Sequence, residues 1–83
     1  MYKVIFSQKA EKQLDKLERK TAERVILTLE RIIIRPQAYV KRLVGCYYHS
    51  LRVGDYRLIL DIQEDKLIIF VIELGHRKNI YKQ

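Results

Sequence analysis

The sequence contains few cysteines and histidines and no long apolar run, and each shortage excludes a class of protein. The single cysteine, Cys46, excludes an internal disulfide framework and favours a reducing, cytoplasmic setting. Two histidines and one cysteine, widely spaced, do not form a zinc-type ligand cluster, so we expect no metal and no other cofactor. We also expect neither a signal peptide nor a membrane-spanning helix, because the apolar runs are too short.

Acidic residues are scarce relative to basic ones. The 83 residues include 17 Lys and Arg but 10 Asp and Glu, which gives a net charge of +7. A small chain with this charge suits a polyanionic partner. Nucleic acid and an acidic protein both fit that description.

The stretch between positions 31 and 54 contains no acid at all, which creates a local positive field. Its aromatic residues include Tyr47 and Tyr48. Rings among cations suit a single-stranded nucleic acid, whose bases stack while its phosphates meet the charges. The alternative is that one tyrosine belongs to the core. The cations of this stretch are Arg31, Arg35, Lys41, Arg42 and Arg52.

Length and hydrophobic periodicity predict a single α+β domain over residues 1–83. Ser7 is a suitable N-cap, and Pro36 should end the second of two helices. The expected order is β-α-α-β-β-β, an antiparallel strand meander packed on an αα-hairpin. We expect a strand at 2–6, helices within 7–17 and 21–34, and strands at 47–53, 56–62 and 66–74.

Gly54-Asp55 predicts a two-residue type II′ hairpin turn, and this turn fixes the register of the flanking strands. Arg52 then lies directly opposite Arg57. Alternation assigns Leu51, Val53, Tyr56, Leu58 and Leu60 to the core face. The opposite face receives Tyr48, Ser50, Arg52, Arg57, Ile59 and Asp61.

The facing arginines permit two interpretations. Like charges in this position cost about 0.2–1 kcal/mol, which a solvated polar face tolerates. Alternatively, a phosphate between the two guanidiniums turns repulsion into attraction, and the pair then forms an anion site.

The last predicted strand is followed by a basic and aromatic segment. We expect Gly75 to end the strand and antiparallel pairing to bring Arg77 close to Arg57, with Tyr81 further along the same rim. The predicted site at this end of the sheet comprises Arg52, Arg57, His76, Arg77 and Tyr81.

The segments LRVGDYRLILDI and ELGHRKNIY together resemble motifs of the RelE/ParE toxin superfamily. The resemblance covers nearly the whole chain, and it implies the toxin of a type II toxin–antitoxin pair. RelE-like members are ribosome-dependent endoribonucleases that cut mRNA in the ribosomal A site, whereas ParE-like members poison DNA gyrase. The resemblance implies two partners, a RelB-like antitoxin and the ribosome with its mRNA. It also implies that toxin and antitoxin form a higher-order assembly, and that the protein does not bind a membrane.

The RelE-like pattern implies catalytic roles for Arg57, Arg77 and Tyr81. The ribose 2′-OH would attack the adjacent phosphorus, the arginines would stabilise the developing charge, and the tyrosine would stack on a base or transfer a proton. Relatives often have lysines where this chain has Tyr48 and Ser50, which leaves the general base unassigned. The residues expected to bind RNA are Lys41, Arg42, Tyr48, Arg52, His76 and Lys78.

Two further alternatives remain open at this point. A gyrase poison without nuclease activity is the runner-up, and a non-catalytic binding module for nucleic acid or protein is the third. An uncovered apolar patch would suit a partner protein. In strict alternation that patch comprises Ile59, Phe70, Ile72 and Leu74.

Overall fold

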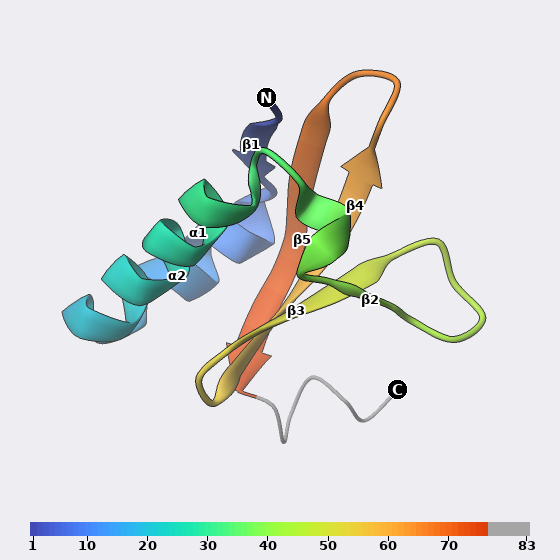
Figure 1. Ribbon diagram of the computed structural model, residues 1–83. Helices are drawn as coiled ribbons and strands as arrows, with labels where there is room; N and C mark the ends of the chain where they lie inside the picture. The colour runs from blue at the N-terminus through green and yellow to red at the C-terminus, as the bar shows by residue number, and fades with distance from the viewer. Residues whose placement is uncertain (77–83) are drawn as a thin grey trace.

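The computed structural model describes residues 1–76, which form a five-stranded mixed sheet with two helices packed on one face (Figure 1). The strand order is β1-β5-β4-β3-β2. The predicted α+β class, with a helical hairpin against a strand meander, is confirmed. The elements are β1 (Lys3–Phe6), α1 (Gln8–Asp15), α2 (Arg19–Ile32), the 3₁₀ helix η1 (Pro36–Ala38), β2 (Lys41–Arg42), β3 (His49–Val53), β4 (Tyr56–Gln63) and β5 (Ile68–His76).

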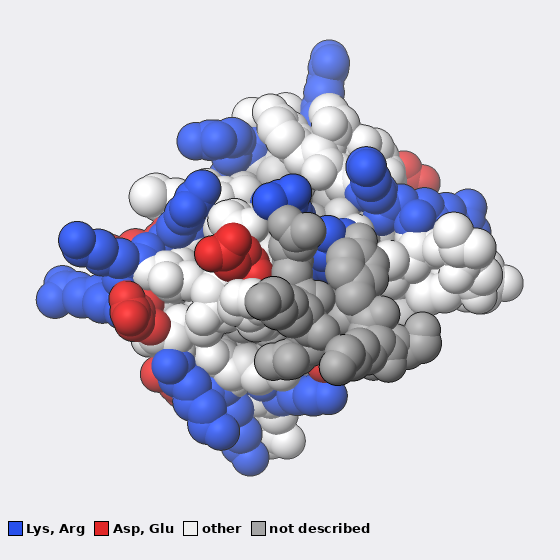
Figure 2. Space-filling model, turned by 90° about the horizontal axis from the view of Figure 1, so that it is seen from below, with Lys and Arg blue, Asp and Glu red and all other residues white. Residues whose placement is uncertain are grey.

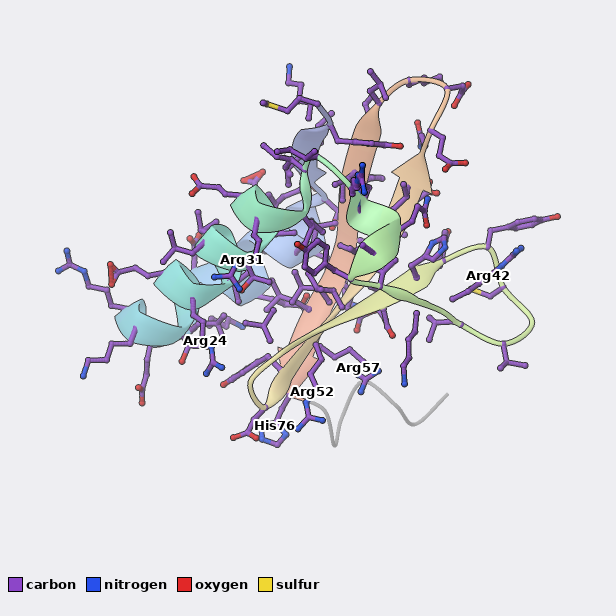
Figure 3. All side chains as sticks on the ribbon, viewed as in Figure 1. Arg24, Arg31, Arg42, Arg52, Arg57 and His76 are labelled. Atoms are coloured by element: carbon purple, nitrogen blue, oxygen red, sulfur yellow. The ribbon has the colours of Figure 1, made fainter. Side chains whose placement is uncertain are left out.

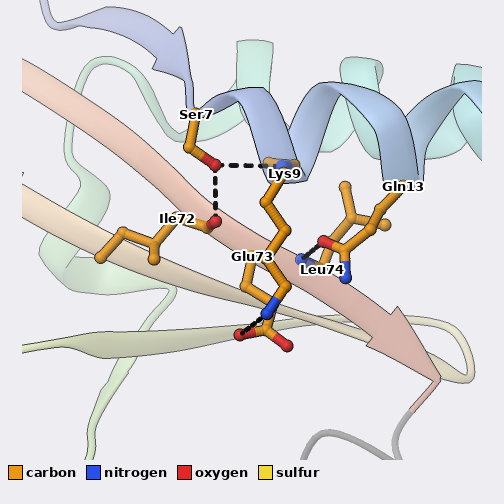
Figure 4. A network of polar contacts seen from close by, with 7 residues as sticks. Ser7, Lys9, Gln13, Ile72, Glu73 and Leu74 are labelled. Atoms are coloured by element: carbon orange, nitrogen blue, oxygen red, sulfur yellow. Dashed lines mark hydrogen bonds and ion pairs between the residues drawn. The ribbon is translucent and has the colours of Figure 1, made fainter.

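Ser7 joins the first strand and the first helix to β5. Its hydroxyl accepts a 3.0 Å hydrogen bond from the Ala10 N–H, which confirms the predicted N-cap. The same hydroxyl donates to the Ile72 carbonyl at 2.6 Å (Figure 4). Further along α1, Gln13 Oε1 accepts from the Leu74 N–H at 2.8 Å. β1 pairs in parallel with β5 only as far as Val71. Beyond that residue, the side chains of Ser7 and Gln13 form the hydrogen bonds to the backbone at this edge of β5.

The core lies between the helices and the sheet. Val25, Leu29 and Ile32 form the buried stripe of α2, at the three- and four-residue spacing of one helix face. The sheet contributes side chains that alternate along β3 and β4 but not throughout β5. These are Leu51, Val53, Leu58, Leu60, Ile69, Val71 and Leu74.

The predicted hairpin register is confirmed. Val53 pairs with Tyr56, and Arg52 pairs with Arg57. Gly54 has φ +60°, whereas the one non-glycine residue with positive φ among those described is Leu67. A positive φ at the first central position alone is the pattern of a type II′ turn.

Strict alternation fails in β5. The pairing with β4 shifts between Ile59 and Leu60, which is the signature of a β-bulge. Leu74 is therefore a core residue with 1% of its surface exposed, and the prediction that it belongs to an uncovered apolar patch is wrong.

The strand boundaries also differ from the prediction. Gly75 does not end β5, because Gly75 and His76 still pair with Arg57 and Tyr56. β5 begins only at Ile68, since the preceding residues form a turn in which Leu67 adopts φ +55°. The short strand β2 was not predicted. Neither helix in the described part of the chain is long and apolar enough to cross a membrane.

Candidate functional site

Arg57 lies on the sheet face opposite the helices, because its neighbours on β4 alternate with it and Leu58 is in the core. Only 8% of its surface is exposed. Its Nη1 donates a 3.2 Å hydrogen bond to the hydroxyl of Ser50, which is itself buried. The guanidinium is therefore anchored to β3 and not free to extend into solvent. The sequence predicted Ser50 on this face, but its hydrogen bond to Arg57 was not predicted.

Arg52 faces Arg57 across the strand pair, as the turn predicted. Its Nε donates to the Gly54 carbonyl at 3.2 Å, toward the hairpin turn. Arg57 bonds in the other direction, to Ser50, two residues away from Arg52 along β3. The two guanidiniums thus donate to acceptors on opposite sides of their pairing position.

A hollow of about 180 Å³ opens above this pair. β2 places Lys41 beside it, because Lys41 pairs with Ser50, and Tyr39 enters from the end of η1. A water molecule occupies about 30 Å³ in the liquid, so a hollow of this volume has room for a group of several atoms such as a phosphate. The lining comprises Tyr39, Lys41, Ser50, Arg52 and Arg57.

The chemistry of this lining is positive charge and hydrogen-bond donation. Three of its five residues are cationic and none is a carboxylate or an imidazole. Such a set stabilises an anion, including the charge that develops during phosphoryl chemistry. It supplies no ordinary general base. Residues 1–76 contain no group of three or more His, Cys, Asp or Glu placed to hold a metal ion.

Three predicted site residues within residues 1–76 do not line the hollow, namely His76, Arg42 and Tyr48. His76 pairs with Tyr56 and so shares its face, which is the face of the helices. The two rings make an edge-to-face contact with centroids 5.7 Å apart. The prediction that His76 converges with Arg57 is therefore wrong. Arg42 pairs with His49, and its Nε donates to the Cys46 carbonyl in the adjoining loop at 3.4 Å. Figure 3 shows Arg42, Arg57 and His76 on the ribbon.

The remaining predicted residues divide into two groups. Tyr48 directly precedes β3 and is 40% exposed, and its carbonyl accepts from the Leu43 N–H. Arg77, Lys78 and Tyr81 lie outside the described residues. Tyr39 was missed, although its place in the acid-free stretch was a signal that could have found it.

Comparison with known proteins identifies the family. The model for the ParE toxin of type II toxin–antitoxin systems, parDE, matches residues 4–81. The chain belongs to this toxin family. The predicted membership of the RelE/ParE superfamily is confirmed.

Individual relatives carry the RelE name. The mRNA interferase toxin RelE of Escherichia coli K12 is 30% identical over 80 residues, which cover 93% of this chain and 84% of the relative. The toxin–antitoxin complex RelBE2 from Mycobacterium tuberculosis contains a chain with 25% identity and a TM-score of 0.84, over 92% of this chain and 98% of that one. For the isolated E. coli RelE toxin the identity is 25% and the TM-score 0.79, over 92% and 84%. The protein is thus a type II toxin that matches the ParE family model and has relatives named RelE.

Proposed function

We propose that the protein is a RelE-type mRNA interferase, a ribosome-dependent endoribonuclease that cleaves mRNA in the A site. The observation that carries this proposal is the buried guanidinium of Arg57, fixed by Ser50 inside a cationic hollow. Burial of a charge is costly unless it is compensated. A small protein that merely required surface charge for a partner would not need to bury an arginine in this way.

The proposed reaction needs no bound cofactor. The ribose 2′-oxygen attacks the adjacent phosphorus and forms a new O–P bond, while the bond from phosphorus to the 5′-oxygen breaks. The products are a 2′,3′-cyclic phosphate and a free 5′-hydroxyl. One proton leaves the 2′-OH, and another is delivered to the departing 5′-oxygen.

In this proposal Arg57 and Arg52 stabilise the charge on the pentavalent phosphorus, and Lys41 binds the phosphate. The sequence pattern assigns Arg77 to the same charge and Tyr81 to base stacking or proton transfer. The hollow contains neither imidazole nor carboxylate. Positioning of the mRNA by the ribosome would then supply much of the acceleration, which is why we propose activity on ribosomes and not on free RNA.

A cognate antitoxin completes the proposal. Solved structures similar to this chain include the intact E. coli RelBE toxin–antitoxin complex, with 27% identity and a TM-score of 0.78. We infer that a RelB-like antitoxin binds this toxin, blocks the cationic hollow and joins it in a higher-order assembly. The free toxin would act in the cytoplasm, where the ribosomes are.

Gyrase poisoning is the second candidate, and two observations favour it. The matching family model is that of ParE toxins, and the chain has Tyr48 and Ser50 where RelE-like proteins often have lysines. In that case the hollow would serve no cleavage reaction.

One paired experiment separates the two candidates. Wild type and Arg57→Gln are added to a translation extract, new mRNA 5′-ends are mapped, and gyrase supercoiling is assayed in parallel. We expect codon-spaced cuts by wild type and, on the scale of a lost oxyanion donor, a decrease of about 100-fold or more in the variant. Arg19→Gln, at the exposed start of α2, is the matched control. Gyrase inhibition without new mRNA ends would replace this proposal with the second.

A further inference from the structure

A second hollow of about 470 Å³ lies between α2 and β3. It is accessible because β2 pairs only with His49 and Ser50, which leaves the rest of β3 as an open edge. Tyr39 and Arg52 line this hollow and also the one around Arg57, so the two are neighbours. We call it the α2–β3 groove. It is lined by Arg24, Leu27, Thr28, Arg31, Tyr39, Leu51, Arg52, Val53 and Gly54.

The groove is strongly cationic. Three of its lining residues are arginines and none is an acid. Arg24 and Arg31 are exposed, and within residues 1–76 neither forms an ion pair. They stand seven positions apart on α2, about 10 Å along the helix axis. Figure 3 shows both on α2 beside the strand that carries Arg52. A row of guanidiniums with this separation suits a chain of negative charges.

The guanidinium of Arg24 lies against the hairpin turn. A Cβ atom added to Gly54 would lie 2.9 Å from Arg24 Nη1, so the guanidinium packs directly over the glycine. At that end of the molecule, Lys and Arg atoms occupy more of the visible surface than Asp and Glu atoms do (Figure 2). The groove and the Arg57 hollow share Arg52, so the two cationic linings adjoin.

The groove suits RNA better than a protein segment. A helix that binds in a groove needs apolar pockets for its anchor residues. Here Leu51 and Val53 are only 3% and 4% exposed, so Leu27, at 61% exposed, is the one accessible aliphatic side chain of the lining, and a single leucine on the helix surface does not form a row of pockets. Tyr39, by contrast, is 50% exposed at the junction of the two hollows. An accessible ring between guanidiniums is the combination that binds single-stranded nucleic acid.

We propose that the α2–β3 groove is a second RNA-binding subsite for the single-stranded segment next to the nucleotide in the Arg57 hollow. Arg24 and Arg31 bind its phosphates, and Tyr39 stacks on a base where the strand passes from one hollow to the other. This subsite rests on the proposed function for its ligand, but its contacts are separate from the cleavage step.

The test measures binding of a 2′-O-methyl single-stranded RNA, which lacks the nucleophile, by fluorescence anisotropy over a range of salt concentrations. We expect Arg24→Gln/Arg31→Gln to weaken binding about tenfold and to reduce the salt slope by about 1.4, which corresponds to two lost phosphate contacts. Arg24→Lys/Arg31→Lys should restore the slope. Tyr39→Ala should weaken binding about tenfold through lost stacking.

Arg19→Gln/Lys20→Gln is the matched control, because it removes the same charge from the exposed N-terminal end of the same helix. Equal losses in this control and in the Arg24/Arg31 variant would overturn the proposal, since a general positive field would then suffice. It would also be overturned if the Arg24/Arg31 variant lost affinity for polyglutamate but retained its affinity for RNA, because the groove would then bind acidic protein.

The two proposals fail in different ways. Groove-dependent binding by a wild-type protein that cuts no mRNA on ribosomes would support the subsite and refute the proposed function. If the wild type cleaves mRNA on ribosomes but the Arg24/Arg31 variant and its control have the same RNA affinity, the proposed function is supported and the subsite is refuted.

Discussion

Substitution of Ser50 by alanine tests how Arg57 is held. The serine hydroxyl accepts from Arg57 Nη1 at 3.2 Å, and the two residues are only 4% and 8% exposed. Alanine leaves that donor facing a methyl group in a place that water reaches poorly. A hydrogen bond to a charged group contributes about 1.5–3 kcal/mol, and 3.2 Å is at the long end of the range. We therefore expect Ser50→Ala to lower the free energy of unfolding by about 1.5 kcal/mol.

The same change should lower activity more than stability alone explains. Without its acceptor on β3 the guanidinium is held less firmly, and displacement of a catalytic group by about 1 Å can cost up to 100-fold in rate. We expect single-turnover cleavage on programmed ribosomes to slow about 10- to 100-fold, at temperatures where the variant is fully folded.

Ser50→Thr is the control, because threonine keeps the hydroxyl and is favourable in a strand. It should retain most of the rate. If Ser50→Ala unfolds more easily in urea but cleaves at the wild-type rate, Ser50 does not position Arg57 for catalysis and the reasoning above is refuted.

Three further predictions concern other parts of the molecule. Ser7→Ala loses both the α1 cap and the bond to the Ile72 carbonyl, so urea unfolding should show a loss of about 1–3 kcal/mol; an unchanged midpoint would contradict this role. Gly54→Ala should lower the melting temperature because alanine is strained at φ +60°, whereas the Arg24 guanidinium, 2.9 Å from the new methyl, can move away at little cost; an unchanged melting temperature would contradict this strain. Tyr81→Ala should cleave about tenfold or more slowly through lost stacking, and Tyr81→Phe should do so only if the hydroxyl transfers a proton. Wild-type single-turnover rates in both would remove Tyr81 from the site.

The sequence predicted those features that depend on short-range geometry. A two-residue turn at Gly54-Asp55 permits one register, and that register placed Arg52 opposite Arg57 correctly. The N-cap at Ser7 is equally local. Lys41 could be assigned to the cationic site because it lies in a stretch without acids.

Features that depend on distant parts of the chain were missed. The bulge in β5 follows from how that strand pairs with β4, and it moved Leu74 to the core face against the expected alternation. His76 was misplaced because the strand was expected to end before it. A two-residue strand such as β2 has no periodicity to detect. Arg57 is buried and donates a hydrogen bond to Ser50 on the adjacent strand, and its neighbours in sequence reveal neither feature.

The central claim is that the cationic hollow cleaves mRNA only when the ribosome presents it. The most direct measurement compares single-turnover cleavage of one mRNA, free and in the A site of a programmed ribosome, by wild type and Arg57→Lys. Lysine keeps the charge but loses the planar donor pair of the guanidinium. We predict efficient cleavage by wild type on the ribosome, little on free RNA, and a decrease of at least about tenfold for Arg57→Lys on the ribosome. Equal rates on free and ribosome-bound mRNA, or no cleavage of either, would contradict the claim.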